Sequence, residues 1–238
     1  MGHEGKDSMA GAGLFIAIGL VAMGFLLKSA IVTFKESERV VYVKGLAEKE
    51  VPADQVIWPL VFKEVGDDLP TLYEAIEAKN QAILAFLKSN GIEESEITFS
   101  APAIIDMKAE RYVNDKVPYR YNVTSVLTVS STKVDVVRQL MLRQKDLLKQ
   151  GIAISGGDFQ YTTQFNFTKL NDVKPGMIAE ATSNARLSAE KFAKDSESNL
   201  GKIKSATQGQ FSISDRDANT PYIKTIRVVT TIEYYLKD

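Results

Sequence analysis

The chain has 238 residues, enough for one sizeable domain or two smaller lobes, and its 45% hydrophobic and 25% charged residues are typical of a folded globular protein. The 29 basic and 30 acidic residues give a net charge of -1, so the basic surplus of a nucleic-acid-binding surface is missing. With no cysteine and a single histidine, His3, the folded part cannot use disulfides, thiolates or histidine-based catalysis.

An uncharged apolar run extends from Ser8 to Leu27. As a helix at about 1.5 Å per residue it spans about 30 Å, the thickness of the hydrocarbon core of a bilayer, and it shows no polar stripe. The alternatives are a buried core helix or a cleaved signal peptide, but cleavage after Ala30 would put Lys28 where a small residue is needed. We therefore expect an N-terminal tail over 1–9 and a retained transmembrane anchor over 10–34.

The basic residues near this anchor bear on its orientation. Lys28, Lys35 and Arg39 follow it, whereas Lys6 and the α-amino group precede it. The positive-inside rule by itself favours the cytoplasm for the C-terminal side, by a small margin.

After a charged tether at 35–39, period-two and helical patterns alternate. Strands are predicted over 40–47, 55–65, 103–111, 118–130, 152–155, 159–168, 202–213 and 223–236. Helices are predicted from Asp68 to Asn90, from Thr132 to Gly151 and from Val173 to Leu200, the last with Ile178, Ala181, Ala185, Ala189 and Phe192 facing inward. Pro59 cannot donate a ladder hydrogen bond, so its strand is expected to be bulged or at a sheet edge there. Antiparallel strand pairs with interspersed helices predict an α+β fold.

Three stretches resemble the SIMPL-domain proteins, a family first catalogued as a domain of unknown function. They are VKGLAEKEVPADQVIWPLVF (43–62), YRYNVTSVLTV (119–129) and AEATSNARLSAEKFAKDSESNLGKIKSATQGQF (179–211). In the first stretch the motif residues are Gly45, Glu48, Val51, Pro52 and Asp54. The resemblance covers about residues 38–238.

The resemblance implies two α+β lobes built from strand-strand-helix units with antiparallel sheets. The end lobe would comprise about 38–100 plus 170–238, and the inserted lobe about 101–169. It also implies export to the periplasm or an envelope membrane, assembly into large oligomers and a link to envelope or oxidative stress. The family has no established catalytic residues. This chain departs from the family in the apparent uncleaved anchor and in Trp58-Pro59.

Several residue groups resemble functional sites, but none is predicted to be catalytic, cofactor-binding or metal-binding. Asp215, Asp217 and Asn219 begin like a calcium loop but lack its glycine and its closing glutamate, so a turn is expected. Gly156-Gly157-Asp158 lacks the pattern of a phosphate loop. The acidic cluster Glu93, Glu94 and Glu96 is expected to be solvated. Five aromatic residues are expected to pack in the core of a sheet rather than stack on a ligand: Tyr119, Tyr121, Tyr161, Phe165, Phe167. Two glycosylation patterns, Asn122-Val-Thr124 and Asn166-Phe-Thr168, lie in predicted strands and are discounted.

The sequence therefore predicts a single-pass protein of the inner (cytoplasmic) membrane, non-enzymatic and homo-oligomeric, whose folded part faces the periplasm or cell exterior. Its partners would be the lipid bilayer and other copies of the chain, without nucleic acid and without a cofactor. One alternative is a sensor that binds a small molecule in the cleft between the two lobes. Another is a carboxylate- or serine-based hydrolase, which the lack of a usable histidine disfavours.

Overall fold

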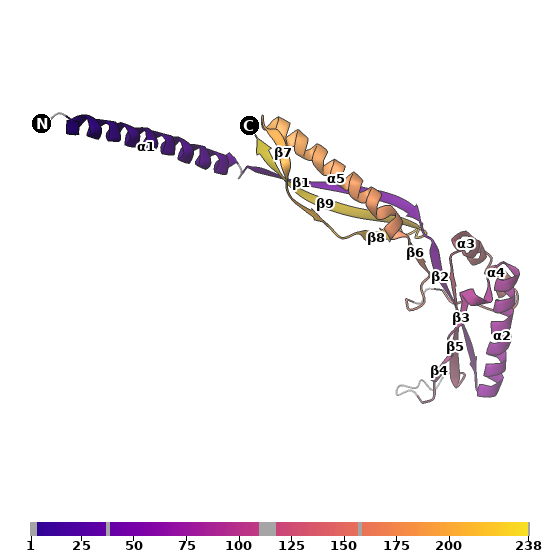
Figure 1. Ribbon diagram of the computed structural model, residues 1–238. Coiled ribbons are helices and arrows are strands. Elements are labelled where there is room, and N and C mark those ends of the chain that lie inside the picture. The colour runs from indigo at the N-terminus through magenta and orange to yellow at the C-terminus, as the bar shows by residue number, and fades with distance from the viewer. Residues whose placement is uncertain (1–3, 37–38, 110–117, 157–158, 238) are drawn as a thin grey trace. The chain divides into compact units, whose positions relative to one another are not determined.

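The computed structural model describes residues 4–36, 39–109, 118–156 and 159–237 (Figure 1). The chain divides into two compact units. The first comprises Met1–Glu48, Lys174–Ser212 and Arg227–Asp238, and the second comprises Lys49–Val173 and Ile213–Ile226. The expected α+β class with antiparallel sheets and an N-terminal apolar helix is confirmed.

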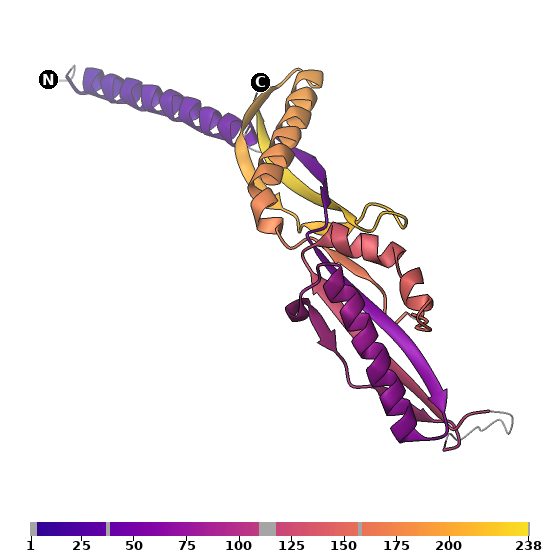
Figure 2. The same ribbon diagram turned by 90° about the vertical axis from the view of Figure 1, so that its right-hand side faces the viewer.

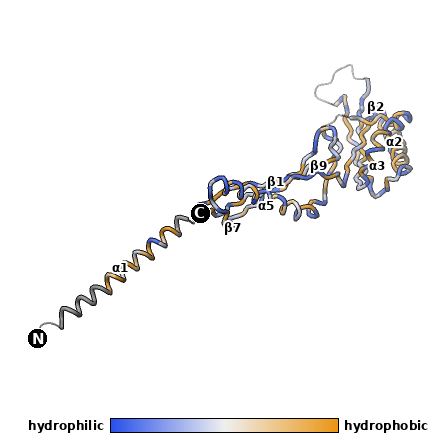
Figure 3. The backbone as a smooth tube through the Cα atoms, turned by 90° about the horizontal axis from the view of Figure 1, so that it is seen from above, coloured by the Kyte–Doolittle hydropathy of each residue, from blue (hydrophilic) through white to orange (hydrophobic). Residues whose placement is uncertain are grey.

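The N-terminal helix, α1, runs from Glu4 to Glu36. It therefore begins inside the expected tail and continues past the expected end of the anchor. Figure 3 colours much of its described length as hydrophobic. Between Phe15 and Val32 every side chain is exposed, because no described part of the chain packs on this segment.

One sheet has the strand order β1-β9-β7, with β8 also paired to β9. Most of β1 and β9 and the whole of β7 belong to the first unit, whereas β8 beyond Ser212 belongs to the second. These strands are β1 (Val40–Pro52), β7 (Asn199–Gln208), β8 (Ser212–Asp215) and β9 (Ile223–Lys237). Helix α5 (Leu170–Asp195) lies against one face of this sheet (Figure 2). Its buried stripe is almost entirely alanine, so its backbone can approach the sheet closely: Met177, Ala181, Ala185, Ala189, Ala193.

The inward face of α5 was predicted correctly at its alanines but not at its end. Phe192 was expected to be inward, yet 60% of it is exposed. The stripe continues by four-residue steps from Ala189 to Ala193, and Phe192 lies one residue off that line. The helix also ends at Asp195, before the expected Leu200, which instead lies in β7 and pairs with Leu236 of β9.

The second unit contains a sheet in the order β3-β5-β2-β6, with β4 also paired to β5. The strands are β2 (Gln55–Gly66), β3 (Ile97–Phe99), β4 (Ala103–Asp106), β5 (Tyr121–Ser131) and β6 (Gln164–Asn166). Strands β2 and β5 pair antiparallel over their full length, from Val56↔Ser131 to Gly66↔Tyr121. The helices are α2 (Leu69–Ser89), the short η1 (Glu94–Glu96), α3 (Val134–Leu142) and α4 (Lys145–Leu148).

One hydrophobic core joins these helices to the sheet. Alternate residues of β2 provide one side of it, and the apolar faces of α2, α3 and α4 provide the other: Trp58, Leu60, Phe62, Ile83, Leu87, Val137, Leu147. The polar Asn80 on the buried face of α2 accepts a hydrogen bond from the Ser125 hydroxyl at 3.2 Å. Asp68 caps the helix as expected, accepting from the Thr71 N–H at 3.0 Å.

Pro59 lies within β2, in unbroken register opposite Thr128. On the other side of β2, the described strand β6 pairs only with Gln55–Ile57. At Pro59 the strand therefore has one partner strand, which is the edge arrangement rather than the bulge.

Several expected elements are shorter than predicted. The helix expected from Thr132 to Gly151 is divided into α3 and α4 by a turn at Arg143 and Gln144. Residues 152–155 are not a strand; they lie along β2 and give it one hydrogen bond, from the Ser155 N–H to the Val61 carbonyl at 2.6 Å. Of 159–168 only β6 is a strand, and part of the expected strand 103–111 lies outside the described residues.

The compact units do not follow the expected lobe boundaries. The expected end lobe began with 38–100 and the inserted lobe with 101, which would separate β2 from β5. Because β2 and β5 pair over their whole length, β2 and α2 belong to the same unit as β5.

Candidate functional site

Gly45, the glycine of the first SIMPL-like stretch, lies where β1 passes under α5. A methyl group at this position would lie 1.8 Å from the Ala181 carbonyl oxygen and 2.4 Å from the Ala185 nitrogen. Both distances are shorter than any van der Waals contact, so only glycine fits. The residue is needed for helix–sheet contact, not for chemistry.

Asp54, at the end of the same motif, follows β1 and ties two distant segments together. Its carboxylate accepts the backbone N–H groups of Thr168 at 2.8 Å and Lys169 at 3.2 Å. Its own N–H donates to the Asn166 carbonyl at 2.9 Å. Asp54 therefore fixes the entry into α5, a structural task for a carboxylate.

The remaining residues of this motif divide by exposure. Val51 is buried, whereas Glu48 and Pro52 are exposed on β1. No member of the motif contacts a cluster of ionisable groups in the described part of the chain.

The acidic cluster after α2 is held by neighbouring groups. Glu93 and Glu96 form a reciprocal capping box around η1. The Lys133 ammonium bridges them, at 2.9 Å from Glu93 Oε1 and 3.1 Å from Glu96 Oε2. Glu94 pairs separately with Lys88.

Glu96 is the best enclosed carboxylate of this cluster. Burial acts to raise its pKa, but hydrogen bonds from the Ser131 hydroxyl, the Glu93 N–H and Lys133 outweigh burial and lower the pKa. A general acid at neutral pH needs a raised pKa, so this arrangement supports the structural interpretation of the cluster.

The calcium-like residues form the turn between β8 and β9. Asp217 accepts the N–H groups of Asn219 at 2.8 Å and Thr220 at 2.9 Å, and it also accepts the Thr220 hydroxyl. Arg216 pairs with the same carboxylate at 3.1 Å, and Asp215 pairs instead with Lys224. These bonds build an aspartate-stabilised turn, as the sequence predicts.

The hydrogen bonds from Thr220 and Arg216 lower the pKa of Asp217 from 3.8 to about 2. A carboxylate whose pKa is depressed by folding stabilises the fold above its ordinary pKa and loses that effect as the pH falls through the depressed value. We expect Asp217→Asn to be less stable than the wild type at about pH 5, with the difference shrinking as the pH falls toward about 2 and vanishing below it. Urea midpoints of both proteins across this range measure it, and a gap that does not change with pH would refute the assignment.

The five aromatic residues that could stack on a ligand do not form one continuous surface. Only Phe165 is fully buried, and its ring meets Tyr222 edge-on with centroids 6.1 Å apart. Tyr119 is 46% exposed, and Tyr121 carries the Arg120 guanidinium over its ring at 4.9 Å. Tyr161 and Phe167 are half-buried.

The asparagines of both glycosylation patterns lie in strands, and the phosphate-loop pattern is described only in part. Asn122 lies in β5 and Asn166 in β6. The Asn166 amide donates to Gln55 at 3.4 Å. Gly156 is described, but Gly157 and Asp158 lie outside the described residues.

Two buried charged residues, Lys224 and Glu233, were not anticipated, and Glu233 is the carboxylate of the two. Glu233 of β9 is 6% exposed and accepts from the Lys204 ammonium and the Ser205 hydroxyl, each at 3.0 Å. Burial acts to raise its pKa, but the hydrogen bonds from Lys204, Tyr42 and Ser205 lower it. In the sequence, Glu233 is a single acidic residue within an apolar strand, and its partners Lys204 and Ser205 lie in another strand. Many strands on protein surfaces have the same pattern, so the sequence did not identify this residue.

No group of three or more His, Cys, Asp or Glu side chains that could hold a metal ion occurs among the described residues. The clearest feature with a functional meaning is α1. Its segment Phe15–Val32 is long and apolar enough to cross a membrane, and none of it is buried within the chain. A signal sequence at the N-terminus passes the same test of length and composition.

Comparison with known protein families identifies the family to which the folded part of the chain is similar. The model of the SIMPL family, described as a protein of unknown function (DUF541), matches residues 41–234. No curated protein matches the chain. The family match includes residues of both compact units and leaves out the apolar helix α1. Since the match covers most of its length, the chain belongs to the SIMPL family.

Proposed function

We propose that this SIMPL-family chain is a single-pass, non-enzymatic protein of the cell envelope that assembles with copies of itself. The observation that carries the proposal is the exposed apolar segment Phe15–Val32 of α1. Its length of about 27 Å suits the hydrocarbon core, and burial in lipid would remove from water the large side chains that it now exposes. Phe15 and Phe25, for example, are 77% and 74% exposed.

The membrane is proposed to be the inner (cytoplasmic) one, with the folded units in the periplasm or outside the cell. Family resemblance supports this orientation, as it supports a role in envelope or oxidative stress. The basic residues after the span, including Lys28, favour the opposite orientation by a small margin. Long folded regions cross membranes largely regardless of such a margin, so we give the family more weight.

A non-enzymatic role is supported by how the ionisable side chains are used. The carboxylates with lowered pKa values in the described part are held by hydrogen bonds or ion pairs with neighbouring residues, as in Glu96, Asp217 and Glu233. The only histidine is His3 and there is no cysteine. The usual nucleophile–base pairs of hydrolases therefore have no counterpart here.

Self-assembly is proposed to use the open edge formed by β7. This ten-residue strand pairs with β9 on one side and is exposed at almost every position. An exposed strand edge presents unpaired N–H and C=O groups that another copy can meet by adding a strand. The opposite edge of this sheet is β1, whose residues alternate between buried and exposed over much of the strand, and the edge strands of the other sheet, β3, β4 and β6, have only three or four residues each.

Cross-linking in carbonate-washed membranes tests anchoring and assembly together. We expect an amine-reactive reagent to give bands at multiples of 26.3 kDa from the washed pellet. Ile203 of β7 and Ile104 of β4 are 51% and 55% exposed, so they form a matched pair for substitution. Ile203→Asp should reduce the cross-linked species at least about tenfold, because it introduces a charge at the proposed contact without adding an amine, whereas Ile104→Asp should not.

Two results would contradict the proposal. Wild-type chain that is pelleted but cross-links only as a 26.3 kDa monomer would exclude assembly. Equal cross-linking of the two variants would exclude β7 as the edge that assembles.

A further inference from the structure

A groove runs along helix α2 in the second compact unit, between the helix and residues 99–104 of the neighbouring sheet edge. It consists of two hollows, of about 420 Å³ and about 360 Å³, that share Tyr73, Ile76 and Pro102 and therefore adjoin. Both volumes fall within the range of about 300–1,000 Å³ that small-molecule sites occupy. Apart from Val123 of β5, the lining residues come from 69–104, a stretch that the structure describes continuously.

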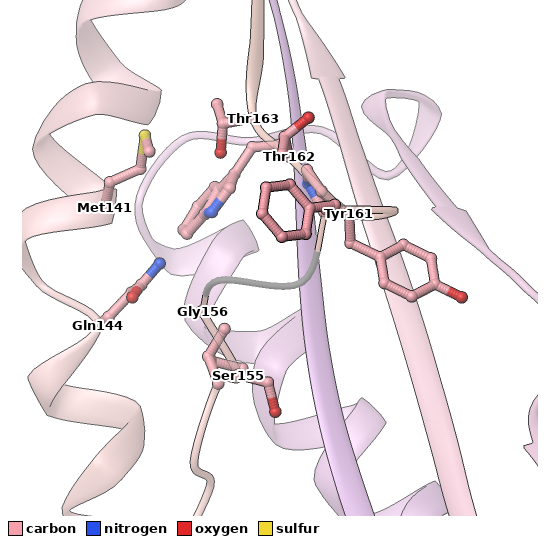
Figure 4. A pocket seen from close by; sticks show the side chains of 11 residues that line it. Met141, Gln144, Ser155, Gly156, Tyr161, Thr162 and Thr163 are labelled. Carbon is pink, nitrogen blue, oxygen red and sulfur yellow. The ribbon is translucent and has the colours of Figure 1, made fainter. Parts of the chain in front are cut away.

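A different hollow of the same unit lies beside β2. Figure 4 shows it between Met141 and Gln144 on one side and Thr162 and Thr163 on the other. Residues 157–158, at its border, lie outside the described residues, so the groove along α2 is the hollow that supports an inference.

The groove is the space between α2 and an edge of the sheet. Helix α2 packs on β2 and β5, the central strands, whereas β3 and β4 pair in turn with successive parts of β5 and form the edge beside it. Pro102 lies between these two short strands. Tyr73 of α2 and Ile104 of β4 stand on the two sides of the groove and remain 65% and 55% exposed.

The larger hollow is apolar. It lies at the N-terminal part of α2, and the side chains that form its walls are mainly aliphatic: Leu69, Leu72, Ile76, Pro102, Ile104, Val123. Each methylene group that leaves water for such surroundings strengthens binding about fourfold. This hollow therefore favours a hydrocarbon chain.

The smaller hollow continues the groove toward the C-terminal part of α2 and adds polar side chains: Glu77, Asn80, Gln81, Glu94, Ser100. Glu94 forms an ion pair with Lys88. Glu77 accepts a hydrogen bond from the Gln81 carboxamide at 2.9 Å, and it forms no ion pair with a lysine or arginine among the described residues. Its carboxylate is thus available to a cation in the groove.

We propose that this groove binds a small aliphatic amine, with its hydrocarbon chain in the larger hollow and its ammonium group beside Glu77. Leu69 and Glu77 are eight positions apart on α2, so at about 1.5 Å per residue they are separated by about 12 Å, which a chain of about eight carbons spans. A carboxylate of the same length would bring like charges together at Glu77. The inference goes beyond the proposed anchoring and assembly, neither of which requires a ligand.

Calorimetry of the full-length protein in phosphatidylcholine nanodiscs tests the proposal, with empty nanodiscs as the blank. Titration with hexylammonium chloride at pH 7 should give a saturable heat with a Kd of about 1 mM, which is ordinary for so small a ligand. Butylammonium is two methylene groups shorter and should bind about tenfold more weakly. Hexanoate, which has the same number of carbons and the opposite charge, should also bind at least about tenfold more weakly.

Two matched pairs of exposed residues locate the ligand. Glu77→Gln should raise the Kd for hexylammonium at least about threefold, whereas Glu74→Gln, on the same helix but outside both hollows, should leave it unchanged. Ile104→Ala should likewise raise the Kd at least about threefold, because it removes part of the apolar wall. Ile105→Ala alters the next residue of β4, which lies outside both hollows, and should not change the Kd.

The proposal is overturned if hexylammonium gives no saturable heat up to about 20 mM, or if either groove variant binds it as its control does. Equal binding of hexanoate and hexylammonium would mean that the groove selects the chain and not the charge, and it would overturn the assignment of an amine. Carbonate extraction and cross-linking test the anchoring and assembly separately, so a failure of this proposal is distinguishable from a failure of those.

Discussion

Replacing Gly45 by alanine is expected to disrupt the first compact unit. The added methyl group would meet the backbone of α5 at 1.8 Å and 2.4 Å, so the helix must move away from β1 along its buried stripe. Overpacking of this kind against a backbone costs at least about 3 kcal/mol, a large part of the stability of an ordinary domain. Chemical denaturation followed by far-UV circular dichroism measures the loss, because α5 contributes strongly to that signal.

Two further variants test the stated cause. Gly176→Ala places the same methyl group on α5 itself, where nothing lies within 4 Å, and it should leave stability unchanged or raise it by up to about 1 kcal/mol. Adding Ala185→Gly to Gly45→Ala should recover little, because the shortest contact is with the Ala181 carbonyl oxygen. Full rescue by Ala185→Gly would show that the Ala185 side chain, at 2.9 Å, is the decisive contact instead.

Local patterns predicted which residues form strands and helices, but not which strands share a sheet. The alternation in β2 and β5 is visible in the sequence, and so is the cap at Asp68. The pairing of β2 with β5 depends on contacts between residues more than fifty positions apart, such as Gly66 with Tyr121 and Val56 with Ser131. No local signal specifies such a pairing, so the expected lobe boundary separates two strands that share a sheet.

The same limit applies to the candidate sites. A turn at Asp217 could be predicted because its hydrogen-bond partners, Asn219 and Thr220, are neighbours in sequence. The close passage of Gly45 under α5 could not, because the residues it meets lie far along the chain.

The family motif takes on a physical meaning once these contacts are known. Gly45 allows α5 to approach the sheet, and Asp54 holds the segment that leads into the same helix. Both residues therefore determine where α5 lies. A motif of this kind identifies a fold and by itself assigns no chemistry to the chain.

Two arginines in the middle of α1 are expected to release the protein from the membrane. Leu20→Arg combined with Leu26→Arg places two charges within the apolar segment Phe15–Val32, at about 2.5–3.5 kcal/mol each for insertion. Leu142→Arg combined with Leu148→Arg is the control, because those leucines are 73% and 62% exposed on the second compact unit and should tolerate the same change. Carbonate extraction should leave the wild type and the control in the pellet and move the α1 variant to the supernatant.

Protease treatment of intact spheroplasts carrying the same proteins tests the orientation. The wild type should be digested from outside, and the α1 variant, which fails to insert, should be protected until lysis because its folded units remain in the cytoplasm. Protection of the pelleted wild type would mean that the basic residues after the span set the orientation, with the folded units inside. A wild type that washes off and begins after Ala30 would mean that α1 is a cleaved signal sequence, and the anchoring proposal would fall.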